Sequence, residues 1–119
     1  GFTGQLLKTI AKHVPPPAGP RSPALWGTRA RIAEMFERHA TSISMAQRTF
    51  MFRYRSPAHW LEVFRSYYGP MLKAFAALDA AGQAGLERDV LALIAGGNRS
   101  GDATMVVPGE YLEIVISRR

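Results

Sequence analysis

The sequence predicts an α+β fold, in which about five helices pack on a small sheet made of two long strands. A chain of 119 residues, 47% of them hydrophobic, is long enough to bury the core of one domain. Apolar residues recur at helical spacing in several segments, whereas they alternate along two stretches near 43–55 and 104–117. We therefore predict a single domain that spans residues 1–119.

The N-terminal third is expected to form two helices joined by a loop. Apolar spacing predicts a helix over 3–14, and the three prolines that follow end it. Residues 15–27 are rich in proline, glycine and serine and contain one large aromatic side chain, Trp26. Thr28 is suited to cap a second helix over 29–39, because its hydroxyl can accept a hydrogen bond from a free amide of the first turn.

The stretch 43–55 has the period of a strand, in which successive side chains point to opposite faces. Phe50, Phe52 and Tyr54 fall on one of these faces. We expect all three rings to pack beneath a helix.

The middle of the chain is expected to be helical. Ser56 is a candidate N-cap for a helix over 57–68, and a proline at the first helical position favours that start. A Gly-Pro pair ends this helix, after which the helical pattern resumes over 71–80. Gly82 is expected to close that segment, and a further helix is predicted over 84–95.

The C-terminal stretch is predicted to be strand over 104–107 and 110–117, with a Pro-Gly break between the two pieces. Residues 110–117 are apolar on both faces, which is typical of a strand that is central or covered on both sides. Two strands alone make a marginal sheet. Either further strands come from elsewhere, or the helices cover this one.

Charge and composition exclude several classes of protein. The absence of cysteine excludes disulfides, cysteine-ligated zinc and a thiol nucleophile. No apolar run approaches ~18 residues and no secretory pattern is present, so we expect a cytoplasmic protein without a membrane span. The net charge of +6 can attract phosphate or anionic lipid. The basic residues are scattered, however, so a solvated surface is the competing interpretation.

Three arginines alternate with aromatic residues along the first predicted strand. Arg48, Arg53 and Arg55 are candidates for binding nucleic acid, because sheet surfaces that stack bases combine these residue types. The glycine of the RNA-recognition signature is absent here. The competing interpretation places the rings in the core and the arginines in solvent.

An aromatic group centred on the helix over 57–68 is the other candidate site. It could line an apolar pocket for a small organic molecule, with ordinary core as the alternative. The Tyr67 hydroxyl is the best candidate for a polar contact in such a cleft, and His59 is a candidate general base. The candidate substrate-binding residues are Trp26, His59, Trp60, Tyr67 and Tyr68.

No motif in the chain predicts a catalytic, cofactor-binding or metal-binding residue. The glycine-rich segment 96–101 follows a helix and precedes a strand, the reverse of the order that a nucleotide-binding turn requires. The separations of His13, His39 and His59 fit no local metal motif. Asp102 is expected to be a turn residue.

Several segments together resemble the C-terminal part of class I S-adenosylmethionine-dependent methyltransferases of the type-11, ubiquinone/menaquinone-biosynthesis-like group. The matching pieces are GFTGQLLKTIAKHVPPPAG (1–19), SPALWGT (22–28), RTFMFRYRSPAHWLEVFRSYYGPMLKAFAALD (48–79) and NRSGDATMVVPGEYLEIVISRR (98–119). These pieces span almost the whole chain.

The resemblance implies that this chain is the C-terminal portion of a Rossmann-like methyltransferase fold. The strand near 43–55 would be the sixth of the family's sheet, and that near 104–117 would be the antiparallel seventh. The segment 57–97 would then be an elaboration over the substrate side. The glycine-rich cofactor loop lies in the family's other half, so no residue of this chain is assigned to the cofactor.

Three expectations about function follow from the resemblance. The parent enzyme would use S-adenosylmethionine and a small-molecule substrate, whereas this chain would be inactive alone, which leaves its own status as an enzyme open. A homodimer is expected, formed through an exposed strand edge or by exchange of an element such as the helix over 3–14. The alternative is a stand-alone basic α+β module that binds nucleic acid or a small apolar ligand.

Overall fold

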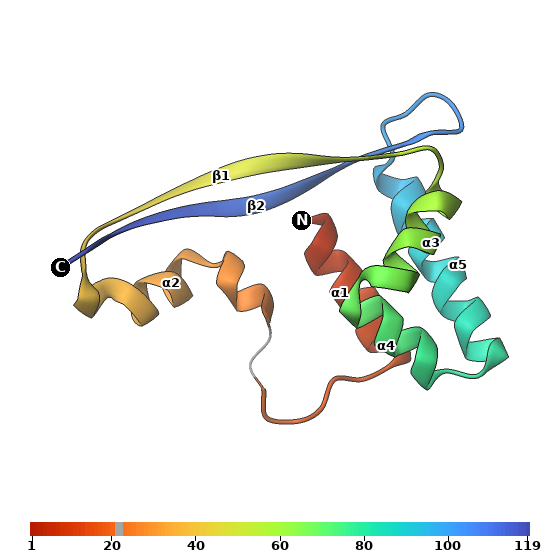
Figure 1. The fold of residues 1–119 in the computed structure, drawn as a ribbon, viewed down its shortest axis with the longest axis horizontal. Helices are drawn as coiled ribbons and strands as arrows, with labels where there is room; N and C mark the ends of the chain where they lie inside the picture. The colour runs from red at the N-terminus through yellow and green to blue at the C-terminus, as the bar shows by residue number, and fades with distance from the viewer. Residues whose placement is uncertain (21–22) are drawn as a thin grey trace. The chain divides into compact units, whose positions relative to one another are not determined.

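The computed structural model describes residues 1–20 and 23–119 and confirms the α+β class (Figure 1). Part of the predicted loop over 15–27, at 21–22, lies outside the described residues. None of the described helices is long and apolar enough to cross a membrane. In chain order the elements are α1 (Phe2–His13), the 3-10 turn η1 (Pro23–Gly27), α2 (Arg29–Phe36), η2 (Glu37–His39), β1 (Ala40–Tyr54), α3 (Pro57–Tyr67), α4 (Gly69–Ala77), α5 (Ala80–Gly97) and β2 (Met105–Arg118).

The chain forms two compact units, and each strand contributes to both. The first, here called the helical unit, comprises Gly1–Pro17 and Met51–Gly109. The second, here called the strand unit, comprises Ala18–Phe50 and Glu110–Arg119.

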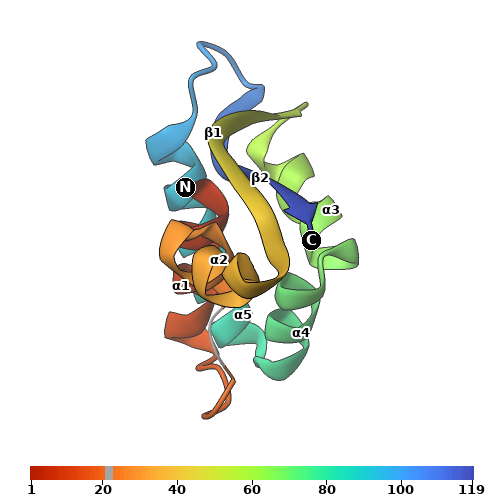
Figure 2. The same ribbon diagram turned by 90° about the vertical axis from the view of Figure 1, so that its left-hand side faces the viewer.

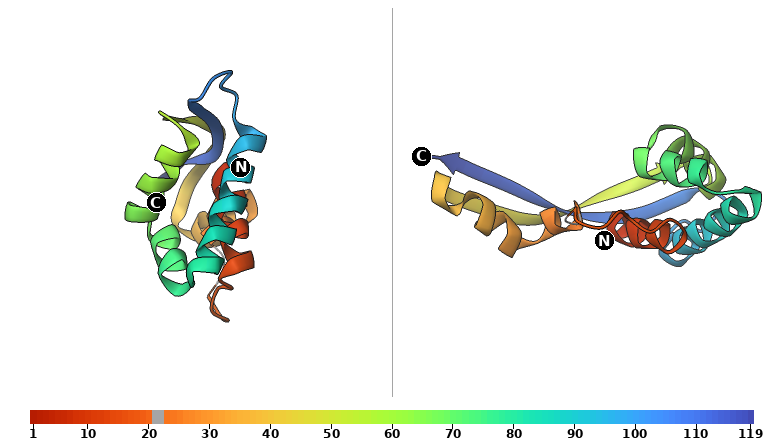
Figure 3. Two further views of the ribbon diagram at one scale, coloured as in Figure 1. Left: turned by 90° about the vertical axis from the view of Figure 1, so that its right-hand side faces the viewer. Right: turned by 90° about the horizontal axis from the view of Figure 1, so that it is seen from below.

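The core of the helical unit is apolar and contains no buried charged residue among those described. Within this unit α1 packs along α5, and α3 packs against α4 (Figure 3). Burial of these helix faces supplies the main stabilisation of the unit, because each large apolar side chain removed from water contributes about 1.5–3 kcal/mol. Its largest fully buried side chains are Trp60, Leu6, Met71, Leu86, Ile94, Met105, Val90 and Val107.

Side-chain caps set the starts of two helices of this unit, α3 and α5. The Ser56 hydroxyl accepts a hydrogen bond from the His59 amide at 3.0 Å, which confirms the predicted start of α3. The Asp79 carboxylate accepts from the Gly82 amide at 2.8 Å, so α5 begins at Ala80. The prediction that Gly82 closes a helix is therefore wrong, because the cap places this glycine within the first turn.

The start of α4 and the end of α2 also differ from prediction. The pair Gly69-Pro70 begins α4 directly after α3, since proline at the first helical turn needs no hydrogen-bond partner for its nitrogen. Helix α2 ends at Phe36, and residues 37–39 tighten into the 3-10 turn η2. Thr28 caps α2 as predicted, through a hydrogen bond from the Arg31 amide.

In the strand unit β1 and β2 pair as an antiparallel ribbon beside α2 (Figure 2). The Thr41 hydroxyl donates to the Ser117 carbonyl at 3.2 Å, and the Gln47 amide donates to the Glu110 carboxylate at 2.8 Å. These contacts join the start of one strand to the end of the other, which fixes the antiparallel direction. The described sheet has these two strands only, so each strand keeps one open edge.

Strand β2 corrects two predictions. It runs through Pro108 without a break, because a strand with an open edge tolerates the missing proline amide. Its second half is not covered on both faces: Leu112 is half-buried, whereas Tyr111 and Val115 are 51% and 57% exposed. Within the described chain no further strand or helix covers that outer face.

The aromatic face of β1 is only partly packed. Phe52 and Tyr54 pack against the core of the helical unit, as predicted. Phe50 is 55% exposed, so the prediction that all three rings lie under a helix is wrong. Phe50 belongs to the strand unit, whose described part offers it no comparable core.

Candidate functional site

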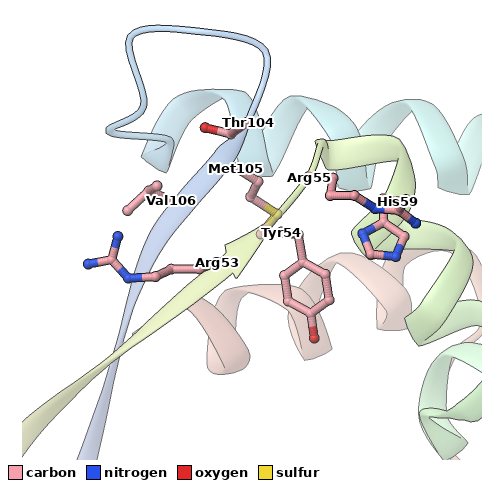
Figure 4. A pocket seen from close by; sticks show the side chains of 7 residues that line it. All are labelled: Arg53, Tyr54, Arg55, His59, Thr104, Met105 and Val106. Carbon is pink, nitrogen blue, oxygen red and sulfur yellow. The ribbon is translucent and has the colours of Figure 1, made fainter.

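A hollow of about 550 Å³ opens at the carboxyl end of β1, within the helical unit (Figure 4). Three elements meet there: the last residues of β1, the first turn of α3 and the first residues of β2. Its lining residues are Arg53, Tyr54, Arg55, His59, Thr104, Met105 and Val106.

Two rings and two arginine side chains are among the groups that line the hollow. The rings of Tyr54 and His59 lie 5.6 Å apart between centroids and are tilted by 60°. Figure 4 shows Arg55 beside His59, whereas Arg53 extends on the other side of the end of β1, near Val106. The two guanidinium groups therefore extend in different directions from the end of β1, and both line the hollow.

His59 carries an unsatisfied polar atom. Its Nδ1 is buried and has no hydrogen-bond partner among the described residues, and the same holds for Nε1 of the neighbouring Trp60. Buried polar atoms without partners are uncommon and costly. An imidazole nitrogen donates or accepts according to the tautomer. Because Nδ1 is buried, any ligand in the hollow would meet the other atoms of the His59 ring.

The loop before β2 provides the third side of the hollow. The Asp102 carboxylate accepts hydrogen bonds from the hydroxyls of Ser100 and Thr104 and from the Thr104 amide. The Ser100 hydroxyl, followed by the Thr104 groups, lowers the pKa of Asp102 to about 2. Asp102 is therefore ionised at neutral pH and is held by its own turn, as expected of a turn residue.

The predicted aromatic candidates of the helical unit do not line a common cleft. Trp60 is fully buried in the core and stacks on Phe64 at 4.2 Å. Tyr67 is 85% exposed, and Tyr68 is half-buried, where desolvation raises its pKa. Of the candidates in this unit, the structure places only His59 at the hollow.

The fifth aromatic candidate, Trp26, belongs to the strand unit. Its side chain is 54% exposed, and its ring lies 6.4 Å from that of Phe36 in α2. The Phe36 ring offers Trp26 no charged or hydrogen-bonding group.

The three candidate arginines have different surroundings. Arg48, in the strand unit, makes an ion pair with Glu113 at 3.3 Å. Arg53 and Arg55 both line the hollow and are exposed. Thr104 and Met105, which the sequence interpretation missed as lining residues, come beside them through the pairing of β2 with β1.

One further His–carboxylate pair lies away from the hollow. The His13 ring at the end of α1 and Asp89 of α5 are 2.7 Å apart between Nε2 and Oδ2. This hydrogen bond is the main reason that the pKa of Asp89 is lowered. The pair joins two helices that pack together, which is a structural role. No cluster of three or more histidine, aspartate or glutamate side chains suited to a metal ion occurs in the described ranges.

The hollow can therefore hold hydrogen-bond acceptors, because it offers guanidinium and imidazole groups and no lining carboxylate. In comparisons with known proteins, no family model and no curated protein matches the chain.

Proposed function

We propose that this chain is the C-terminal, substrate-side portion of a class I S-adenosylmethionine-dependent methyltransferase that acts in the cytoplasm. The observation that carries the proposal is the ribbon of β1 and β2. These two long antiparallel strands are separated in sequence by three helices, and they leave apolar side chains exposed on one face.

Such a ribbon is a poor sheet by itself. Two-stranded sheets are marginal in water, and open edges offer unpaired backbone groups to other strands. In the methyltransferase family the sixth and seventh strands are antiparallel neighbours within a larger sheet. The antiparallel pairing of β1 with β2 supports that assignment.

The position of the hollow agrees with this assignment. If β1 is the sixth strand of an open α/β sheet, its carboxyl end lies at the edge where such sheets bind ligands. The hollow lies at that end of β1, beneath the start of α3. Residues of α3–α5 would then contribute to the substrate side of the complete enzyme.

The residues of this chain do not fit the cofactor itself. No described strand is followed by a glycine-rich turn and a helix, the arrangement that lets backbone approach a nucleotide. The two arginines at the hollow would also repel the sulfonium charge of S-adenosylmethionine. We therefore derive no methyl-transfer step from this chain.

The isolated chain is accordingly expected not to bind S-adenosylmethionine and to be inactive. Calorimetric titration with the cofactor at millimolar concentration should give no heat beyond that of dilution. Clear one-to-one binding would contradict the assignment of this chain to the half that lacks the cofactor loop.

The isolated chain is also expected to form a homodimer, because each strand of its ribbon has an open edge. Edge pairing between two copies would satisfy those edges, whereas exchange of α1 would join two copies through the helical core instead. Light scattering at high protein concentration should give about twice the 13.1 kDa mass of one chain. A mass of one chain at every concentration would rule out this mode of association.

Nucleic-acid binding through Arg48, Arg53 and Arg55 is the less favoured function, because Glu113 already neutralises Arg48. Strong, salt-dependent binding of an oligonucleotide would favour it over the methyltransferase assignment.

A further inference from the structure

We infer that the hollow at the carboxyl end of β1 is a binding site for a small ligand with two or more phosphate groups. The inference concerns Arg53, Arg55 and His59 of this chain. It does not depend on the methyltransferase proposal, because it needs neither methyl transfer nor residues outside the chain.

The first argument is the charge at the hollow. Two arginines and a histidine line it, and none of its lining residues is acidic. Within residues 1–20 and 23–119, no carboxylate pairs with either guanidinium. Guanidinium groups bind phosphate oxygens strongly, often through two parallel hydrogen bonds.

Some arginines elsewhere in the chain have acidic neighbours, although Arg38 and Arg118 have no described ion pair. Arg31 lies 2.9 Å from Glu34, and Arg48 lies 3.3 Å from Glu113. Arg53 and Arg55 therefore differ from these residues in being left available at a concave surface.

The second argument is that the carboxylate of the loop before β2, Asp102, makes no ion pair with these arginines. Asp102 contacts the lining residue Thr104, and one of its oxygens receives the hydroxyl and amide hydrogen bonds of its own turn. The loop holds this carboxylate in place, so a ligand does not have to displace it from Arg53 or Arg55.

The third argument is the start of α3, which adds positive potential. The first amides of a helix lack intrahelical partners, and the helix dipole is positive at this end. Ser56 satisfies the His59 amide, and Pro57 has no amide hydrogen. Of these residues only His59 lines the hollow, so α3 contributes the positive end of its dipole there rather than a free amide.

The arrangement selects for more than one phosphate. Both arginines line the hollow, and Figure 4 shows their guanidinium groups on opposite sides of the end of β1. An oligophosphate can contact both groups through different phosphates, whereas a single phosphate can contact both only if the two side chains turn towards each other. The His59 ring lies at the Arg55 side, although its Nδ1 is buried and is not itself open to a ligand.

The test is calorimetric titration of the purified chain with sodium tripolyphosphate at low salt. Tripolyphosphate is expected to bind one-to-one and more tightly than inorganic phosphate. The double variant Arg53→Gln/Arg55→Gln should weaken tripolyphosphate binding at least about tenfold, since losing one hydrogen bond to a charged group corresponds to a factor of that order.

The matched control is Arg38→Gln/Arg118→Gln, which changes net charge equally at two exposed positions outside the hollow. It should change the affinity by less than about twofold, which allows for the general field of the protein. The variant His59→Phe should also weaken binding while circular dichroism stays unchanged.

Three results would overturn the inference. One is equal weakening by both double variants, which would indicate general charge attraction. Another is an absence of tripolyphosphate binding. The third is an oligonucleotide that binds at least about tenfold more tightly than tripolyphosphate and depends on the same two arginines, which would assign the site to a phosphodiester backbone.

Discussion

The variant Trp60→Ala is expected to lower the free energy of unfolding by about 3–5 kcal/mol, the usual range for a fully buried large aromatic side chain. Trp60 has no exposed surface. Its ring stacks on Phe64 at 4.2 Å and meets Phe2 of α1 edge-on at 5.6 Å. Truncation would therefore leave a cavity between α1 and α3. Urea denaturation followed by circular dichroism measures the loss.

The matched control is Trp26→Ala. Trp26 is 54% exposed, and removal of an exposed side chain outside a core costs less than about 1 kcal/mol. Similar losses for the two variants would show that Trp60 is not a core residue and would reopen its assignment to a ligand pocket.

The second large effect is expected for Asn98→Ala, at about 2–3 kcal/mol. Asn98 follows α5, and its side-chain oxygen accepts hydrogen bonds from the amides of Ser100 and Val106, at 3.1 and 2.8 Å. Its side-chain nitrogen donates to the Thr104 carbonyl at 3.1 Å. Each such bond contributes about 1 kcal/mol net, and the variant removes all three.

Two companion variants separate these hydrogen bonds from general effects on the loop. Asn98→Asp keeps both accepting positions but sets a carboxylate oxygen against the Thr104 carbonyl, so its cost should exceed the roughly 1 kcal/mol of one lost hydrogen bond. Arg99→Ala removes an exposed neighbouring side chain and should cost less than about 0.5 kcal/mol. A loss for Asn98→Ala no greater than that for Arg99→Ala would show that the loop does not depend on this side chain.

The strands were predictable because their apolar alternation is local. The pattern predicts strands near 43–55 and 104–117, and the structure has Ala40–Tyr54 and Met105–Arg118. Residues 40–42 escaped prediction because Ala-Thr-Ser carries no alternation of large apolar side chains. Their strand conformation depends on pairing with the far end of β2, where Thr41 bonds to the Ser117 carbonyl.

The start of α5 illustrates a competition between two local signals. Glycine is a poor helix former, so Gly82 by itself predicts the end of a helix. The Asp79 carboxylate reverses that effect, since it satisfies the Gly82 amide. The signal that could have predicted the start of α5 is an aspartate, Asp79, three residues before Gly82.

Only some residues of the candidate site could be predicted from the sequence. Alternation identified Arg53 and Arg55 as polar residues at the end of the first predicted strand, but Thr104 and Met105 join them through pairing of distant segments. Helical spacing could not decide between core and pocket for Trp60, because Phe2, at the far end of the sequence, helps to bury it.

The most direct test of the methyltransferase assignment is a calorimetric titration of S-adenosylmethionine into the product of the complete reading frame that encodes this chain. We expect one-to-one binding by that product, through a strand, glycine-rich turn and helix encoded ahead of Gly1, and none by residues 1–119 alone. The proposal would be contradicted if the complete product failed to bind the cofactor, or if its sequence contained no such turn.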